Sequence, residues 1–216
     1  MSEAFGRFRD EAEAFGVRLG ADQIDQFRTY LHELREWNRT VRLVSRDDPE
    51  SVIWLHFLDS LTLFPHLSPE GSLLDMGSGA GFPGVPLKIA CPGMSLHLAE
   101  SRRRKAHFLG HIIRTLGLQN AYVHQSRIEE GSSLGRFQVI ASRALGPPQT
   151  WLPWAIHLMA EEGRIILMLG QRSDVEGVRR LIDPLGLRIA KAVELELPVV
   201  KRRRLIVMLE QSGRFT

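Results

Sequence analysis

The chain before residue 70 shows a helical pattern of hydrophobic positions. Apolar residues recur every three or four positions from Ile24 to Val41, which predicts one amphipathic helix of about five turns. A second stripe with the same period lies within Ser51 to Leu67, between Pro49 and Pro69, and predicts a second helix. The apolar stripes of these two helices cannot fully bury each other. We therefore expect both helices to dock on the part of the chain that follows.

The chain from Gly71 onward alternates short apolar runs with helical patterns. This alternation is typical of a parallel sheet with helices on its faces. The runs of strand length are Ser72 to Met76, Met94 to Ala99, Ala121 to His124, Phe137 to Ala141, and Arg164 to Leu169. Arg102 to Leu116 predicts a helix that stops at Gly117, and Ser173 with Glu176 predicts a capping box for a helix that ends before Pro184.

Two more strands break the alternation near the end of the chain. Apolar and polar residues alternate from Val193 to Leu197 and again from Leu205 to Leu209, with a basic turn between them. Without an intervening helix these two strands must pair antiparallel. The expected fold is therefore α/β, a seven-stranded sheet with a reversed last strand plus N-terminal helices. We expect residues 1–69 to form a helical segment packed on the core and residues 70–216 to form the main domain.

Composition places the chain among globular proteins. The 216 residues are 44% hydrophobic and 25% charged, which excludes a disordered, collagen-like or coiled-coil chain. No apolar run reaches the roughly 18 residues that a spanning helix needs, and the N-terminus lacks the order of a secretion signal. We therefore expect a cytosolic protein without membrane association. The single cysteine, Cys91, excludes an internal disulfide, and no His/Cys pair has metal-ligand spacing, so we expect no metal site.

A glycine-rich loop follows the first strand, at the edge where open α/β sheets bind ligands. Gly77, Gly79 and Gly81 let the backbone turn tightly and approach a ligand, although a purely structural turn would use the same residues. Glu100, at the end of the second strand, is placed to accept both hydroxyls of a ribose. The loop runs G-x-G-x-G with Phe82 after it, which disfavours a dinucleotide and favours S-adenosylmethionine.

The ends of the third and fourth strands offer further candidates. Ser126-Arg127-Ile128-Glu129 follows the third strand, and backbone amides there are placed to read an adenine edge, while the Glu129 carboxylate either joins the site or faces solvent. Arg143 follows the fourth strand, where its guanidinium points into the crevice toward a carboxylate or phosphate. A structural ion pair of Arg143 with Asp75 or Glu129 is the alternative.

Positive charge is clustered, although the net charge is only +3. The run from Arg102 to Lys105 falls in the first turn of a helix, where each cation opposes the helix dipole by about 0.3–1 kcal/mol, so the placement favours a bound anion such as RNA backbone. The run from Lys201 to Arg204 is either an RNA contact or a solvated turn. The candidate RNA-binding residues are Arg102, Arg103, Arg104, Lys105, Lys201, Arg202 and Arg203.

Several segments together point to one family. They are Trp37-Asn38, His56 to Leu61, Asp75 to Pro86 (DMGSGAGFPGVP), Glu100-Ser101 with Lys105 and Phe108-Leu109, Ser126 to Glu129, and Ser142-Arg143-Ala144. In these segments the chain resembles the bacterial 16S ribosomal RNA guanine-N7 methyltransferases, also called glucose-inhibited division protein B. The resemblance covers about Tyr30 to Gly170.

The resemblance implies a class I S-adenosylmethionine-dependent methyltransferase with a Rossmann-like sheet. Its substrate would be N7 of one guanine in the 530 loop of 16S rRNA, and its partner 16S rRNA or the small ribosomal subunit. By matching position, Gly77 and Phe82 flank the cofactor, Ile128 and Glu129 meet its adenosine end, and Arg143 borders the methyl-transfer site. We expect a monomer.

The chain departs from the family pattern at three places. Gln138 stands where an Asp is usual, Leu169 replaces a usual Lys, and Arg42 to Ser45 departs from the usual Asn-Leu-Thr. The missing lysine would have supplied one RNA or cofactor contact.

Guanine N7 carries a lone pair and no proton, so methylation there needs no general base. We therefore expect Arg143 to act in positioning. His56 and Asp59 either touch the RNA or cofactor or form an internal pair. A methyltransferase of small molecules or proteins, and a non-catalytic RNA-binding assembly factor, are the alternative functions.

Overall fold

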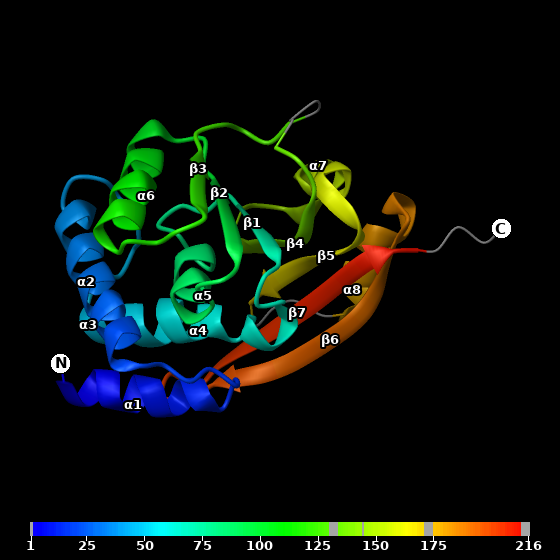
Figure 1. Cartoon of the computed structure of the whole chain (residues 1–216). Helices are drawn as coiled ribbons and strands as arrows, with labels where there is room; N and C mark the ends of the chain where they lie inside the picture. Colours follow the sequence, from blue (N-terminus) through cyan, green and yellow to red (C-terminus); the bar gives the residue numbers. More distant parts are fainter. Residues whose placement is uncertain (1, 130–133, 144, 171–174, 213–216) are drawn as a thin grey trace.

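The computed structural model describes residues 2–129, 134–143, 145–170 and 175–212. The described strands form one seven-stranded sheet in the order β3-β2-β1-β4-β5-β7-β6 (Figure 1). They are β1 (Ser72–Met76), β2 (Ser95–Ala99), β3 (Ala121–His124), β4 (Phe137–Arg143), β5 (Met159–Leu169), β6 (Leu187–Leu197) and β7 (Arg202–Gln211). Strands β1 to β5 are parallel, whereas β7 is antiparallel to both β5 and β6. The predicted α/β fold with a reversed last strand is confirmed.

Helices cover both faces of this sheet. They are α1 (Ser2–Glu13), α2 (Ala21–Asn38), α3 (Pro49–Val52), α4 (Asp59–Leu61), α5 (Gly84–Ala90), α6 (Arg103–Thr115), α7 (Leu152–Leu158) and α8 (Val175–Ile182). The N-terminal helices pack with α5 and α6 on one face, and α7 and α8 pack on the other (Figure 1). Side chains alternate between faces along a strand, so Leu73 of β1 joins the first hydrophobic cluster and Leu74 joins the second.

Most predicted elements are present, with shifted ends. β1 and β3 have the predicted bounds, and α2 and α6 confirm two predicted helices. Helix α1 was not predicted. Ser173 of the predicted capping box lies outside the described residues, although α8 does end before Pro184. No described helix is long and apolar enough to cross a membrane, and no three potential metal ligands gather within the described ranges.

The prediction of one continuous helix over Ser51 to Leu67 is wrong. A π-helical turn, Ile53–Leu58, separates α3 from α4, and Phe64–His66 forms a 3-10 turn. A π turn shifts the backbone hydrogen bonds from i+4 to i+5. Within it the carbonyl of Leu55 accepts a hydrogen bond from Arg143 of β4 at 3.1 Å. Hydrophobic periodicity contains no information about this long-range contact.

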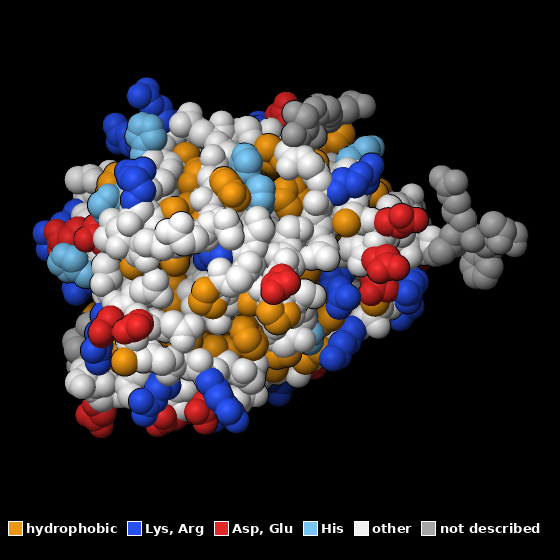
Figure 2. Space-filling view, in the orientation of Figure 1, with side chains coloured by type: hydrophobic (Ala, Val, Ile, Leu, Met, Phe, Trp, Pro, Cys, Tyr) orange, Lys and Arg blue, Asp and Glu red, His pale blue; other side chains and the backbone are white. Residues whose placement is uncertain are grey.

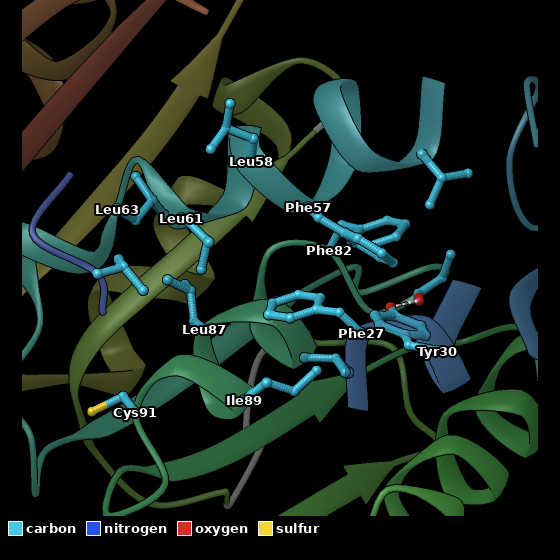
Figure 3. Packing of buried hydrophobic residues seen from close by; sticks show 14 of the residues in the cluster. Phe27, Tyr30, Phe57, Leu58, Leu61, Leu63, Phe82, Leu87, Ile89 and Cys91 are labelled. Atoms are coloured by element: carbon cyan, nitrogen blue, oxygen red, sulfur yellow. Dashed lines mark hydrogen bonds between the residues drawn. The ribbon is translucent and has the colours of Figure 1, made fainter. Parts of the chain in front are cut away.

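Aromatic residues join the N-terminal helices to the sheet domain. Phe8, Phe27, Tyr30, Phe57 and Phe82 are buried in one cluster, most of which is visible in Figure 3. Ring centroids lie 5.0 Å apart for Phe27 and Phe57 and 5.5 Å apart for Tyr30 and Phe82. The segment before residue 70 therefore packs on the core through a shared hydrophobic cluster. The division at residue 69 stays a prediction.

A buried carboxylate adds a polar link between the same two parts of the chain. The Asp59 side chain is 1% exposed and accepts hydrogen bonds from Arg204 Nε at 2.7 Å and from Arg143 Nη1 at 3.2 Å. A buried charge without a partner is strongly destabilising, so these two arginines hold α4 against β4 and β7.

Replacement of Arg204 by Ala tests this link. Arg204→Ala removes hydrogen bonds to a buried carboxylate and should lower the free energy of unfolding by about 1.5–3 kcal/mol. The control is Arg202→Ala, because Arg202 lies two residues away on β7 with an exposed side chain and should change stability by less than about 0.5 kcal/mol. Urea unfolding followed by circular dichroism measures both, and equal stabilities of the two variants would contradict the assignment.

Candidate functional site

A cleft of about 830 Å³ opens at the carboxyl ends of the central strands. Its walls are the glycine-rich loop after β1, residues 99–102 at the end of β2, residues 126–129 after β3, and the start of α7 with the segment before it. The volume lies in the range of small-molecule sites. The cleft therefore occupies the edge of the sheet at which the sequence predicts ligand binding.

The three glycines of the loop have different surroundings. All three have φ between +59° and +96°, a region that favours glycine. Gly77 and Gly79 line the cleft, and a Cβ on Gly79 would lie 4.0 Å from Lys105 Nζ. A Cβ on Gly81 would instead lie 2.7 Å from the hydroxyl of Tyr30, inside the core. The first two glycines therefore shape the cleft, and Gly81 lets the loop pack on the N-terminal helices.

Glu100 fastens the glycine-rich loop to the segment after β2. Its Oε2 accepts from the Gly79 amide at 2.9 Å and its Oε1 from the Arg102 amide at 2.7 Å. The residue is 7% exposed and lines the cleft. Each carboxylate oxygen has two lone pairs, so each retains an acceptor position for a ligand hydroxyl. These acceptor positions fit the ribose hydroxyls of an adenosine cofactor.

The opposite wall combines predicted residues with two that the sequence analysis missed. Ile128 and Glu129 line the cleft together with Trp151 and Trp154. The Glu129 carboxylate is 63% exposed and lies 3.4 Å from Arg127 Nε. The indole N–H of Trp151 is buried without an acceptor among the described residues, a state that costs about 1–3 kcal/mol unless a ligand supplies one. The sequence does contain a signal for this wall: two tryptophans lie three positions apart in the segment after the fourth strand.

Three other predicted residues lie behind the loop and do not line the cleft. Phe82 is part of the aromatic cluster and Gly81 adjoins its Tyr30 member. The rings of Phe82 and His56 stack with centroids 4.8 Å apart. Arg143 places its guanidinium carbon 5.0 Å from the Phe82 centroid and donates from Nη2 to His56 Nδ1 at 2.9 Å. Burial, then the charges of Arg143 and Arg204, lower the pKa of His56 to about 3. His56 is therefore a neutral acceptor at physiological pH.

Arg143 forms an ion pair with a residue that the sequence did not indicate as its partner. The structural ion pair considered from the sequence was with Asp75 or Glu129, whereas in the structure Arg143 pairs with Asp59. The sequence also suggested an internal pair between His56 and Asp59. In the structure both residues bind Arg143. The roles of Phe82 and Arg143 toward a cofactor stay predictions.

The first basic run lies at the rim of the cleft. Arg102 and Lys105 line the cleft, and Arg103 and Arg104 are exposed on the first turn of α6. Within the described ranges, none of these four side chains forms an ion pair. Their charges are therefore available to an anion.

The second basic run lies farther away along the same edge of the sheet. Strand β6 runs parallel to β1–β5, so the turn between β6 and β7 is on the cleft side. It lies four to five strand positions from β2, or about 19–24 Å. Lys201 Nζ lies 3.7 Å from the Glu196 carboxylate, and Arg202 and Arg203 are exposed. Arg204 turns inward to Asp59.

Comparison with known proteins identifies the family. The family model described as rRNA small subunit methyltransferase G (GidB) matches residues 23–204. The protein of that name from Geotalea uraniireducens is 35% identical over 204 residues, covering 93% of each chain. The one from Roseiflexus sp. strain RS-1 is 37% identical and covers 91% of this chain and 87% of the relative. The chain belongs to this family.

Solved structures show the same fold at low sequence identity. A ribosomal protein L11 methylase from Lactobacillus delbrueckii subsp. bulgaricus superposes with a TM-score of 0.59 at 10% identity, covering 74% of this chain and 79% of that chain. A precorrin-6y C5,15-methyltransferase from Geobacter metallireducens gives 0.57 at 13% identity, covering 79% and 91%. These matches confirm the class I methyltransferase fold of this GidB-family chain.

One departure from the family pattern has a structural role in this GidB-family member. Gln138 Oε1 accepts from the Ser72 amide at 3.1 Å, and the Gln138 amide donates to the Ser72 hydroxyl at 3.1 Å. The residue therefore joins the starts of β1 and β4, at the end of the sheet away from the cleft. Leu169 is partly buried against the second hydrophobic cluster.

A buried carboxyl group underlies the glycine-rich loop. Asp75 is fully buried, its Oδ2 accepts from the Gly84 amide at 3.0 Å, and its Oδ1 has no partner among the described residues. Burial raises the pKa of Asp75 to about 7 against the lowering effect of the Gly84 amide. The carboxyl therefore changes its charge near neutral pH.

Asp75 makes the stability of this protein depend on pH. Its native pKa lies above the unfolded value of 3.8, so the native state binds more protons between about pH 4 and pH 7. Stability should fall through this window, with a slope of up to about 1.4 kcal/mol per pH unit from this group.

Asp75→Asn should remove that contribution, so the variant should gain stability relative to the parent as pH rises from 4.5 to 7.5. Urea unfolding across the window measures the difference, with Asp10→Asn on the exposed face of α1 as control. Parallel curves for Asp75→Asn and the parent would contradict the assignment.

Proposed function

We propose that this protein transfers the methyl group of S-adenosylmethionine to N7 of a guanine in the 530 loop of 16S rRNA. Membership of the rRNA small subunit methyltransferase G family makes it an S-adenosylmethionine-dependent rRNA methyltransferase. The observation that supports the proposed site is an open cleft in which the glycine-rich loop and Glu100 meet the cations Arg102 and Lys105. When bound, the cofactor supplies a methyl group on a sulfonium centre.

The lining of the cleft suits a reaction that needs no proton transfer. Guanine N7 presents an in-plane lone pair and no proton, so its attack on a methyl group requires no general base. Among the described residues that line the cleft there is no histidine, and the carboxylates are those of Glu100 and Glu129. Glu100 holds two backbone amides and is placed to hold hydroxyls. Catalysis then comes from orientation, with the reacting atoms about 3–3.5 Å apart and in line.

Arg143 acts in this proposal as a positioning residue. Its guanidinium lies over Phe82, binds His56 and pairs with Asp59, and this group of contacts supports the glycine-rich loop from behind. The loop in turn forms the wall of the cleft at Gly77 and Gly79.

The substrate is RNA in this proposal, as the naked 16S molecule or within the small ribosomal subunit. Unpaired cations at the rim of the cleft support this choice, because phosphates would compensate their unfavourable position at a helix N-terminus. A small-molecule methyltransferase would have no use for these charges. A monomeric, cytosolic enzyme remains our expectation.

Direct analysis of the product tests the function. The purified protein is incubated with labelled S-adenosylmethionine and either 16S rRNA or small ribosomal subunits from a strain that lacks the homologous enzyme. Nuclease digestion and mass spectrometry should find one 7-methylguanosine, in the 530 loop. Methylation of another atom would refute the proposed position. Absence of S-adenosylmethionine binding in calorimetry would favour a non-catalytic RNA-binding protein.

Glu100 provides a test of the cofactor site. Glu100→Ala removes a charged acceptor, each hydrogen bond to which contributes about 1.5–3 kcal/mol, so we expect the Kd for S-adenosylmethionine to rise at least roughly tenfold. Isothermal titration calorimetry measures the change. The control is Glu176→Ala on the exposed surface of α8, and an unchanged Kd for Glu100→Ala would reject the proposed contact.

A further inference from the structure

The outer face of α6 carries cations at both of its ends. The helix has 13 residues, RRKAHFLGHIIRT, and none of them is acidic. Arg103, Arg104, His107 and Arg114 are exposed. Figure 2 shows Lys, Arg and His side chains gathered over this helix. Within the described ranges, none of the three arginines forms an ion pair, and an arginine stays charged at any physiological pH.

A second cavity lies beside the far end of this helix. It has a volume of about 350 Å³ and is bounded by α6 and by Trp37 near the end of α2. His111 forms part of its wall, with Nε2 2.7 Å from the Glu33 carboxylate and its ring 5.2 Å from that of Trp37. His107 and Arg114 also line it. The cavity therefore offers aromatic rings and one unpaired guanidinium.

Gly110 forms the part of the cavity wall between His107 and Arg114. A Cβ at Gly110 would lie 3.4 Å from Arg114 Nη1, so the guanidinium lies close to the space that a side chain would take. Residues 103, 107, 110 and 114 follow the i, i+4, i+7, i+11 spacing of one helix face. A bare glycine on this face leaves room for a ligand, although alanine would favour the helix by about 1 kcal/mol.

The helix connects this cavity to the main cleft. Arg102, just before α6, lines the main cleft, and Arg114 lines the second cavity. At about 1.5 Å per residue, the two positions are about 18 Å apart along the helix axis. A polyanion that enters the cleft would meet Arg103 and Arg104 before it reaches Arg114.

We propose that the outer face of α6 is an RNA-binding surface, and that the cavity at Trp37, His107 and Arg114 holds one unpaired nucleotide near the methylated guanine. Single-stranded RNA is held by stacking of bases on aromatic rings and by cations on its phosphates. Here the rings of Trp37 and His107 take the base, and the guanidinium of Arg114 takes the adjoining phosphate. This inference rests on the proposed function only in taking the substrate to be RNA.

The test uses binding of the full-length protein to 16S rRNA at several salt concentrations. Arg114→Ala removes one phosphate contact, so the Kd for RNA should rise roughly tenfold and the slope of log K against log salt should fall by about 0.7–0.9. Gly110→Leu fills the cavity and keeps every charge, so it should weaken binding and leave the slope unchanged. Arg179→Ala, an exposed arginine on α8, is the control.

Two further measurements separate the possible outcomes. Calorimetry should give the parent Kd for S-adenosylmethionine with both variants. Thermal unfolding should show parent stability for Arg114→Ala and at least parent stability for Gly110→Leu, because glycine is a poor helix former. These results exclude misfolding as the cause of weak RNA binding. Parent-like RNA binding by both variants overturns the proposal, and an effect of Arg114→Ala alone overturns the nucleotide cavity. These experiments measure RNA binding and not methylation. If the parent protein methylated another atom, the proposed function would be refuted, but the evidence for the RNA-binding surface on α6 would still hold.

Discussion

The buried carboxylate of Asp59 is the constraint on which the arrangement around the cleft depends. A charge in the interior is tolerated only with partners, and here they come from two strands, Arg143 from β4 and Arg204 from β7. The N-terminal helices therefore cannot shift on the sheet without leaving a charge unpaired. Through Arg143 the same contact extends to His56 and Phe82, so it also determines what lies behind the glycine-rich loop.

The glycine-rich loop is held from behind and from one side. Tyr30 donates a hydrogen bond from its hydroxyl to the carbonyl of Ala80, and Gly81 leaves room for that hydroxyl. Glu100 binds the amide of Gly79 from the side of β2. The cleft surface of the loop is thus fixed before any ligand arrives. Such preorganisation lowers the entropy cost of binding, and it suits a reaction that relies on orientation.

Local patterns predicted the parts of the fold that depend on local chemistry. The bounds of β1 and β3 follow from short apolar runs. β1 is buried within the sheet and needs apolar residues on both faces, whereas β3 is a half-exposed edge strand. The cleft was predictable as well, since parallel strands end at one edge of the sheet and Gly79 and Glu100 directly follow two of those ends. The π turn at residues 53–58 was not predictable from local periodicity, because the carbonyl of Leu55 within it bonds to Arg143 on the distant strand β4.

The amino-acid sequence by itself determined the α/β architecture, the reversed last strand, the edge that holds the cleft and the cluster of cations beside it. These features follow from periodicity and from residue order, both of which are local. Only the tertiary structure decided that Arg143 and Arg204 share Asp59, that Phe82 lies behind the loop, and that Trp151 faces the cleft. Such pairings join residues far apart in the chain, and burial leaves each polar group few partners to choose from.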